Sequence, residues 1–212
     1  FLYSEPSREC DPPDQDRLLA DTMKKTGNVV WAVELLDDGD PAPPLEVIRE
    51  ASAGIGFINL PDERDGRIRK AVTFRNGCDS FAAAAVRQYA GFLPPSWETP
   101  APVRINFRGG AGTYASVSMG DVLSGEVPPE KVAGKICLVG AVFRASHDLY
   151  QTVFHDPSTS DTPGIEIHAN IAGNILRGDT IRELSRKGCW LAVILIVLAI
   201  ESLFYADRPW MA

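Results

Sequence analysis

A long apolar stretch near the carboxyl end limits what this chain can be. The 18 residues from Cys189 to Ala206 hold ten Leu, Ile, Val or Phe side chains and one charge, Glu201. As a helix they would span about 27 Å, close to the roughly 30 Å of a bilayer's hydrocarbon core. Those ten side chains favour insertion by roughly 3–6 kcal/mol, against a cost of about 2.5–3.5 kcal/mol for a central acidic residue. The stretch predicts a transmembrane helix. The alternative is a buried helix of the globular part, because the uninterrupted apolar run covers only 12 residues.

The basic residues around this span bear on its orientation. Arg182, Arg186 and Lys187 precede the span, and Arg208 follows it. Under the positive-inside rule, this asymmetry places the preceding residues in the cytoplasm. The rule weakens when an upstream membrane segment has already directed a large domain across the bilayer. Charge alone therefore leaves the orientation open.

Composition restricts the partners of the remaining chain. The formal net charge is −7 and no basic stripe occurs, so the electrostatic footprint of a nucleic-acid-binding protein is missing. Cys10, Cys78, Cys137 and Cys189 are scattered and include no CxxC pair, which argues against a disulfide scaffold and a structural zinc site. We expect no cofactor. If the globular part is extracytoplasmic, Cys10 and Cys78 are candidates for a disulfide.

Residues 1–184 alternate between helical and strand-like patterns. Helices are predicted over 14–26, 45–51, 79–90, 118–123 and the later part of 164–177; strands are predicted over 1–3, 29–36, 54–60, 67–74, 103–107 and 135–142. This alternation predicts an α/β domain with a mixed, mostly parallel sheet and helices on both faces, followed by one transmembrane helix.

Two of these strand predictions have consequences for topology. Strong turn chemistry between Pro61 and Gly66 predicts an antiparallel hairpin of 54–60 with 67–74. The 135–142 segment is almost entirely apolar, as a strand buried on both faces should be.

Candidates for chemistry lie between Ser146 and His168. Glu166 and His168 stand two apart on a predicted strand, where their side chains would share a face. With His147, Asp148, His155 and Asp156 of the preceding loop they could supply metal ligands, or they could hydrogen-bond the loop and the helix that follows. We predict no metal site. Ser146, His147 and Asp148 also supply the residue types of a hydrolase triad, although adjacent residues cannot normally take up triad geometry.

A ligand of this domain is expected at the carboxyl ends of the strands, where open α/β sheets bind their ligands. That places it among the loops after Phe107 and Gly140. Arg108 offers a bidentate fork for an anion. The candidate ligand-binding residues are Arg108, His147, Asp148, Glu166, His168 and Asn170. The alternative is that Glu166 and Asn170 only anchor the loop. The glycine-rich residues 109–112 lack the spacing of a phosphate-binding motif and predict a turn.

Several motifs occur in an order typical of one family. INFRGG begins at Ile105, SMGDVLSG at Ser118, GKICLVGAV at Gly134 and TPGIEIHANIAGNIL at Thr162; DQDRLLA, VVWAVELL, DGRIRKAV and FAAAAV lie upstream. This pattern resembles the second type of CHASE domain, a sensory extracellular domain associated with cyclases and histidine kinases. The resemblance covers residues 1–184.

The resemblance implies a domain outside the cytoplasm, held by an N-terminal membrane helix and followed by several more. Residues 189–206 would be the first of these, and 207–212 the start of a truncated loop. A nucleotide cyclase, a histidine kinase or a serine/threonine kinase usually follows in the family. The family's first strand and upstream membrane helix would precede Phe1, so the resemblance implies an N-terminally truncated sensory domain over 1–184.

These indications together predict an extracytoplasmic (periplasmic) sensory input module of a receptor in the cell membrane. We expect an unknown small ligand, no catalytic residues in this chain, a homodimer in the full-length receptor, and no nucleic-acid partner. Two alternatives are a membrane-tethered hydrolase using His147, Asp148 or His168, and a purely structural dimerisation domain. A hydrolase needs an activated nucleophile beside a base, and no motif supplies one.

Overall fold

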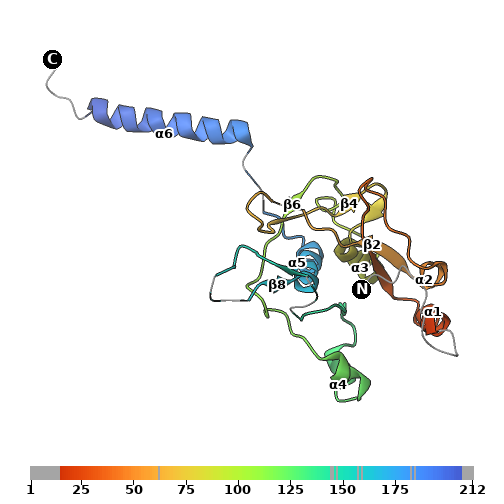
Figure 1. Ribbon diagram of the computed structural model, residues 1–212. Coiled ribbons are helices and arrows are strands. Elements are labelled where there is room, and N and C mark those ends of the chain that lie inside the picture. The colour runs from red at the N-terminus through yellow and green to blue at the C-terminus, as the bar shows by residue number, and fades with distance from the viewer. Residues whose placement is uncertain are drawn as a thin grey trace. The chain divides into compact units, whose positions relative to one another are not determined.

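The computed structural model describes residues 15–61, 63–143, 146, 148–156, 158, 160–181, 183 and 185–206 (Figure 1). The chain divides into two compact units, Phe1–Thr180 and Ile181–Ala212. The predicted strand at 1–3, Cys10, His147 and the predicted loop at 207–212 lie outside the described residues. A disulfide between Cys10 and Cys78 therefore stays a prediction.

The first unit mixes helices with short strands. In chain order its elements are α1 (Gln15–Thr26), β1 (Val30–Val33), α2 (Glu46–Ala51), β2 (Gly54–Phe57), β3 (Lys70–Ala71), β4 (Phe74–Arg75), β5 (Cys78–Asp79), α3 (Phe81–Ala90), β6 (Val103–Arg104), α4 (Met119–Leu123), a 3-10 turn (Pro129–Lys131), β7 (Leu149–Tyr150), β8 (Thr162–Pro163) and α5 (Gly164–Arg177). The helices predicted over 14–26, 45–51, 79–90 and 118–123 are confirmed to within two residues. The α/β class is confirmed as well.

The predicted mostly parallel sheet is not confirmed. β1 and β2 form a parallel pair, with Val30 opposite Gly54 and Val33 opposite Phe57. The pairs β3 with β6, β4 with β5 and β7 with β8 are antiparallel. Among the described residues, antiparallel pairs therefore outnumber the parallel one. The apolar patterns of 29–36 and 54–60 predicted two strands, although not their pairing with each other. The two-residue strands leave too little pattern in the sequence for their pairings to be predicted.

The predicted hairpin of 54–60 with 67–74 is wrong. β2 takes its hydrogen bonds from β1, and residues 67–74 are divided between β3 and β4, which pair elsewhere. The turn itself is present: Gly66 has a φ of +70° and donates from its backbone N–H to Glu63 O at 2.8 Å. Arg69 braces this turn through the Glu63 carboxylate at 2.9 Å and through Asp65. A correct turn thus connects two segments that do not pair with each other.

A different hairpin joins β4 to β5. Its two turn residues, Asn76 and Gly77, both have positive φ values, of 47° and 79°. Those values are characteristic of the type I′ turn, whose twist matches that of the flanking strands and which Asn-Gly favours. The Asn-Gly pair at 76–77 is the sequence signal for this hairpin, which was not among the predicted elements.

The segment 135–142 is not the buried strand that its composition predicts. Ile136 packs against the main core, but Val139 and Val142 are 69% and 64% exposed. A strand buried on both faces needs neighbours on both edges, and no described strand pairs with this segment. The 103–107 strand is likewise shortened to the two residues of β6.

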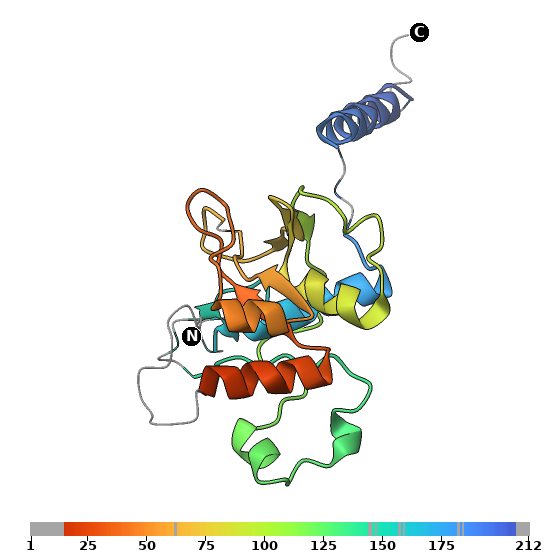
Figure 2. The same ribbon diagram turned by 90° about the vertical axis from the view of Figure 1, so that its right-hand side faces the viewer.

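The main core forms where α3 packs against α5 (Figures 1 and 2), and α3 also contacts β2. The Ala-rich stretch of α3 is buried, and Ser80 caps the helix by accepting from Ala83 N–H at 3.3 Å, although the predicted range of 79–90 begins one residue earlier. Asp79 instead binds Arg87 Nε at 2.8 Å. A Cβ added at Gly56 would lie 2.5 Å from Phe81 Cα. The absence of a side chain at Gly56 therefore permits the close approach of β2 to α3.

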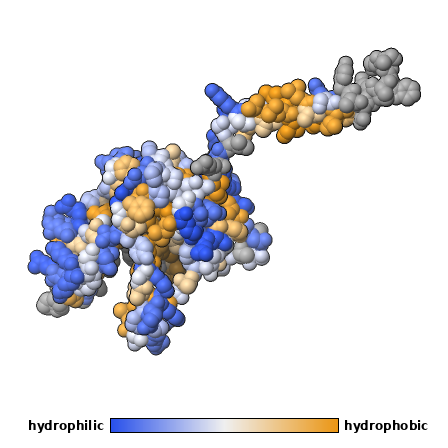
Figure 3. Space-filling view, turned by 180° about the vertical axis from the view of Figure 1, so that it is seen from behind, coloured by the Kyte–Doolittle hydropathy of each residue, from blue (hydrophilic) through white to orange (hydrophobic). Residues whose placement is uncertain are grey.

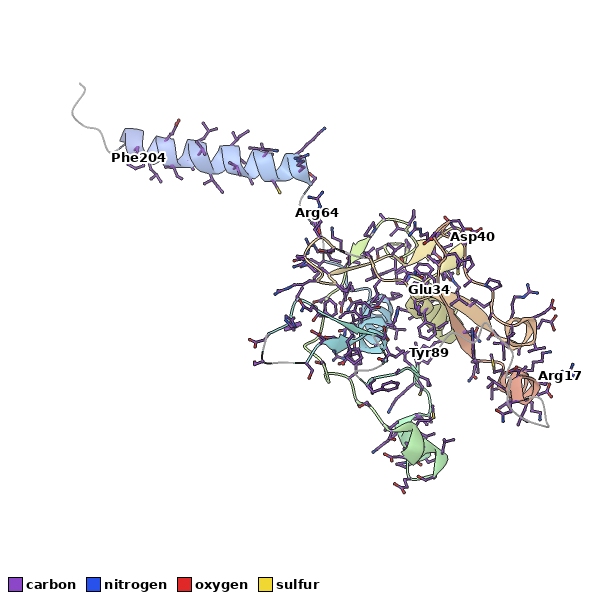
Figure 4. All side chains as sticks on the ribbon, viewed as in Figure 1. Arg17, Glu34, Asp40, Arg64, Tyr89 and Phe204 are labelled. Carbon is purple, nitrogen blue, oxygen red and sulfur yellow. The ribbon has the colours of Figure 1, made fainter. Side chains whose placement is uncertain are left out.

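The second unit contains one helix among its described residues, α6 (Arg186–Ala206). It begins three residues before the predicted Cys189 and ends at the predicted Ala206. The stretch Arg186–Phe204 is long and apolar enough to cross a membrane, and none of it is buried. Apolar side chains cover most of its length and project on every side (Figures 3 and 4).

Candidate functional site

The helix α5 carries a row of polar side chains on an otherwise apolar element. Glu166, Asn170 and Asn174 are spaced four residues apart, which places them one above another on one face of the helix. Asn170 and Asn174 are 1% and 0% exposed, and Glu166 is half-buried. Burying an amide without hydrogen bonds costs free energy of folding, so the hydrogen-bond partners of these side chains show what the row does.

Asn174 and Asn170 bind the backbone of the segment that follows β6. Asn174 Oδ1 accepts from Asn106 N–H at 2.8 Å, while Asn174 Nδ2 donates to Asn106 O at 2.9 Å. Asn170 Oδ1 accepts from Arg108 N–H at 3.0 Å, and Asn170 Nδ2 donates to Glu166 O at 2.9 Å. The amides thus take the place of a neighbouring strand for an extended segment.

Glu166 continues the row to the glycine-rich turn. Its Oε2 accepts from Gly112 N–H at 2.9 Å, and its Oε1 accepts from Tyr114 N–H at 3.2 Å. The structure therefore brings Arg108, Glu166 and Asn170 together, as predicted, but through the backbone of residues 106–114. These are the contacts expected if Glu166 and Asn170 anchor the loop.

The Arg108 side chain is exposed on this surface. Its guanidinium carbon lies 5.9 Å from the centre of the Tyr114 ring, within the range of a cation–π contact. The Tyr114 hydroxyl lies against α5, because a Cβ at Gly173 would be 3.0 Å from it. Arg108 and Tyr114 therefore form the outer layer of the segment that α5 holds.

His168 lies on a different side of α5. Glu166 and His168 were predicted to lie on a strand, but α5 begins at Gly164, and two residues that stand two apart on a helix point about 200° from each other. The prediction that Glu166 and His168 share a face is therefore wrong. His168 is 5% exposed and meets the Phe81 ring edge-on, with ring centres 5.7 Å apart.

The environment of His168 keeps its imidazole neutral. Burial lowers the pKa of His168 from its ordinary 6.5 to about 4, against a smaller opposing effect of a hydrogen bond with the Ile58 backbone. Its Nδ1 is buried and has no hydrogen-bond partner among the described atoms. A side chain enclosed in this way cannot meet a ligand at the surface beside Arg108, nor serve a hydrolase as an accessible base.

Asp148 lies at the amino end of α5. Its carbonyl accepts from Gly164 N–H at 3.0 Å, and a Cβ at Gly164 would collide with its carboxylate. Burial raises the pKa of the Asp148 carboxyl above its usual value. A carboxylate at this end of a helix is favoured by the helix dipole, which accounts for its position without a ligand. Within the described part of the chain, no three His, Cys, Asp or Glu side chains are grouped to hold a metal ion.

One residue of the site, and one hollow outside it, were not predicted from the sequence. Asn174 binds the segment with two hydrogen bonds, and its signal was the four-residue spacing with Glu166 and Asn170 in an apolar helix. Separately, an open hollow of about 550 Å³ lies around the β4–β5 hairpin, lined by Ile55, Phe74, Asn76, Cys78, Asp79 and Arg87 among others. None of the predicted ligand-binding residues lines it.

A mixed α/β unit followed by a helix that could span a membrane is the organisation of a membrane-anchored domain. The family model described as the CHASE2 domain matches residues 1–202, so the chain belongs to this family. The resemblance found in the sequence is thereby confirmed. No curated protein and no solved structure matches the chain. The family is a sensory, non-catalytic domain of signalling receptors.

Proposed function

We propose that this chain is the extracytoplasmic sensory input module of a membrane-bound signalling receptor. The observation that carries the proposal is α6, which is apolar on all sides and has no burial over Arg186–Phe204 in a chain of the CHASE2 family. An apolar helix of this length matches the thickness of a bilayer's hydrocarbon core. The output would be a nucleotide cyclase, a histidine kinase or a serine/threonine kinase, and the full-length receptor would be a homodimer.

Partitioning tests the membrane attachment. The full chain should appear in the membrane fraction and require detergent for extraction. A matched variant with Leu195→Arg and Ile196→Arg should shift toward the soluble fraction, because each charge near the centre of a span costs about 2.5–3.5 kcal/mol. Recovery of the unaltered chain without detergent would contradict the proposal.

The extracytoplasmic orientation rests on family membership and opposes the charge count around the span. Cys137 is exposed in the first unit and offers a test. In intact cells carrying the full-length receptor, a membrane-impermeant maleimide should label Cys137, and the Cys137→Ser variant should show the background. Labelling only after the cells are lysed would favour a cytoplasmic domain.

The ligand is proposed to bind at the surface around Arg108, close to Glu166 and the amino end of α5 near Asp148. The support is chemical: an exposed guanidinium stacked on a tyrosine ring is well suited to a small anion. Thermal unfolding with a panel of small carboxylates and phosphate tests this. Stabilisation should be lost in Arg108→Ala and kept in Arg49→Ala, which removes another exposed arginine. Equal stabilisation of both variants would place the ligand elsewhere.

A further inference from the structure

The segment Asn106–Tyr114 is held on α5 in two unequal parts. Asn106 and Arg108 are bound by Asn174 and Asn170, whose side chains are almost completely buried. Gly112 and Tyr114 are bound by the half-buried Glu166 carboxylate. The inner part of the segment therefore depends on buried amides, and the outer part depends on a carboxylate that water can reach.

The outer part folds onto itself. Thr113 Oγ1 donates to Gly110 O at 2.6 Å, and a Cβ at Gly109 would lie 2.5 Å from Thr113 Oγ1. Gly112 has a φ of +84°, which closes the turn. Residues 109–114 thus form a compact turn, joined to the inner part at a glycine, where the backbone can rotate with little steric cost.

We propose that residues 109–114 form a lid that opens from α5 about Gly109 while 106–108 stay bound, and that the Glu166 carboxylate is its latch. The inference rests on the proposed function, because a sensor needs two arrangements and the lid supplies the second. Hinges of this kind are a few residues that absorb a large change in backbone angles.

The difference in burial explains why the two parts separate. If the inner part left α5, Asn170 and Asn174 would lose partners in the interior and incur the full desolvation penalty. When the lid leaves, water can replace both N–H donors on the half-buried Glu166. The Tyr114 hydroxyl is buried and makes no hydrogen bond among the described atoms, and its ring makes a cation–π contact with Arg108, so neither adds a hydrogen bond between the lid and α5.

Hydrogen exchange of the full chain in detergent, measured residue by residue at neutral pH, tests the lid without any substitution. After correction for intrinsic rates, the amides of Gly112 and Tyr114 should exchange at least about tenfold faster than those of Asn106 and Arg108. Equal protection of all four amides would show that the segment opens as one piece, and would overturn the proposal.

Substitution of Glu166 tests the latch. In Glu166→Gln, exchange should accelerate about tenfold or more at Gly112 and Tyr114 and stay unchanged at Asn106 and Arg108, because a bond to a charged acceptor is stronger than one to an amide. Tyr114→Phe is the matched control and should change none of the four rates. Acceleration at all four amides, or at none, would overturn the assignment. These rates are independent of Cys137 labelling, so failure of the lid and failure of the receptor proposal give different results.

Discussion

Acid should destabilise the first unit through His168. The buried imidazole has a pKa of about 4, whereas it would titrate near 6.5 in the unfolded chain. Because the unfolded state binds the proton more readily, the contribution to stability is complete above about pH 6.5 and is lost as the pH falls through 4. The interval of about 2.5 between the two pKa values, at about 1.4 kcal/mol for each unit of pH, gives a total loss of about 3.5 kcal/mol, of which about 3 kcal/mol is reached by pH 4.

Urea unfolding of the full chain in detergent at several pH values from 7.5 to 4 measures this loss. The comparison is between the unaltered chain and His168→Gln, whose free energy of unfolding should fall about 3 kcal/mol less over that range. The subtraction cancels other groups, including Asp148, whose raised pKa acts in the opposite direction.

The identical pH dependence in the unaltered chain and in His168→Gln would refute the reasoning. Direct titration of the imidazole by NMR covers the case in which the variant does not fold. A His168 that titrates near 6.5 in the folded protein would show that burial between Phe81 and Ile58 does not disfavour its charged form.

The remaining predictions concern stability, measured by urea unfolding. Gly56→Ala should lower the free energy of unfolding by about 1–3 kcal/mol, because its Cβ would overlap the backbone at the start of α3. Gly54→Ala is the control and should be close to neutral, because its Cβ would lie 3.7 Å from a valine methyl. Equal losses in the two variants would contradict this packing. Asn174→Ala should lower the free energy of unfolding by about 2–4 kcal/mol, because it removes two hydrogen bonds with the Asn106 backbone. A loss below about 0.5 kcal/mol would show that Asn174 does not bind the segment. Gly77→Ala should cost about 1–2 kcal/mol because its φ is +79°, and no loss would argue against the type I′ turn.

Local signals in the sequence predicted the local structure of this chain. The alanines of 82–85 favour a helix wherever they stand, and Gly91, with a φ of 79°, ends it as predicted. The partner of a strand is different, because it depends on residues distant in the sequence. The 54–60 segment pairs with β1 rather than with 67–74, although the turn between them formed as predicted. The β4–β5 hairpin was predictable, and its Asn-Gly signal was missed.

The candidate site depended on one such local assignment. Reading 164–167 as a strand placed Glu166 and His168 on one face and suggested a shared ligand. The helical start at Gly164 separates them, with one side chain binding the backbone of 112–114 and the other enclosed in the core. Sequence did predict that Glu166 and Asn170 lie beside the segment after Phe107. It did not predict that buried asparagines would replace a strand there, because such bonds depend on tertiary contacts.

The helix α5 connects the segment that carries the proposed lid to the part of the chain that precedes α6. The face of α5 with Glu166, Asn170 and Asn174 binds the segment that carries the lid, and its apolar residues pack against α3 in the main core. The helix ends at Gly178, with a φ of 67°, and eight residues separate Arg177 from the start of α6 at Arg186. If the lid is the sensing element, its opening changes the hydrogen bonds at one end of α5, while the other end of the helix is joined through this short segment to α6. Arg177, in the last turn of α5, is bound to Asp179 at 2.6 Å, so an ion pair lies at the end of α5 from which that segment starts.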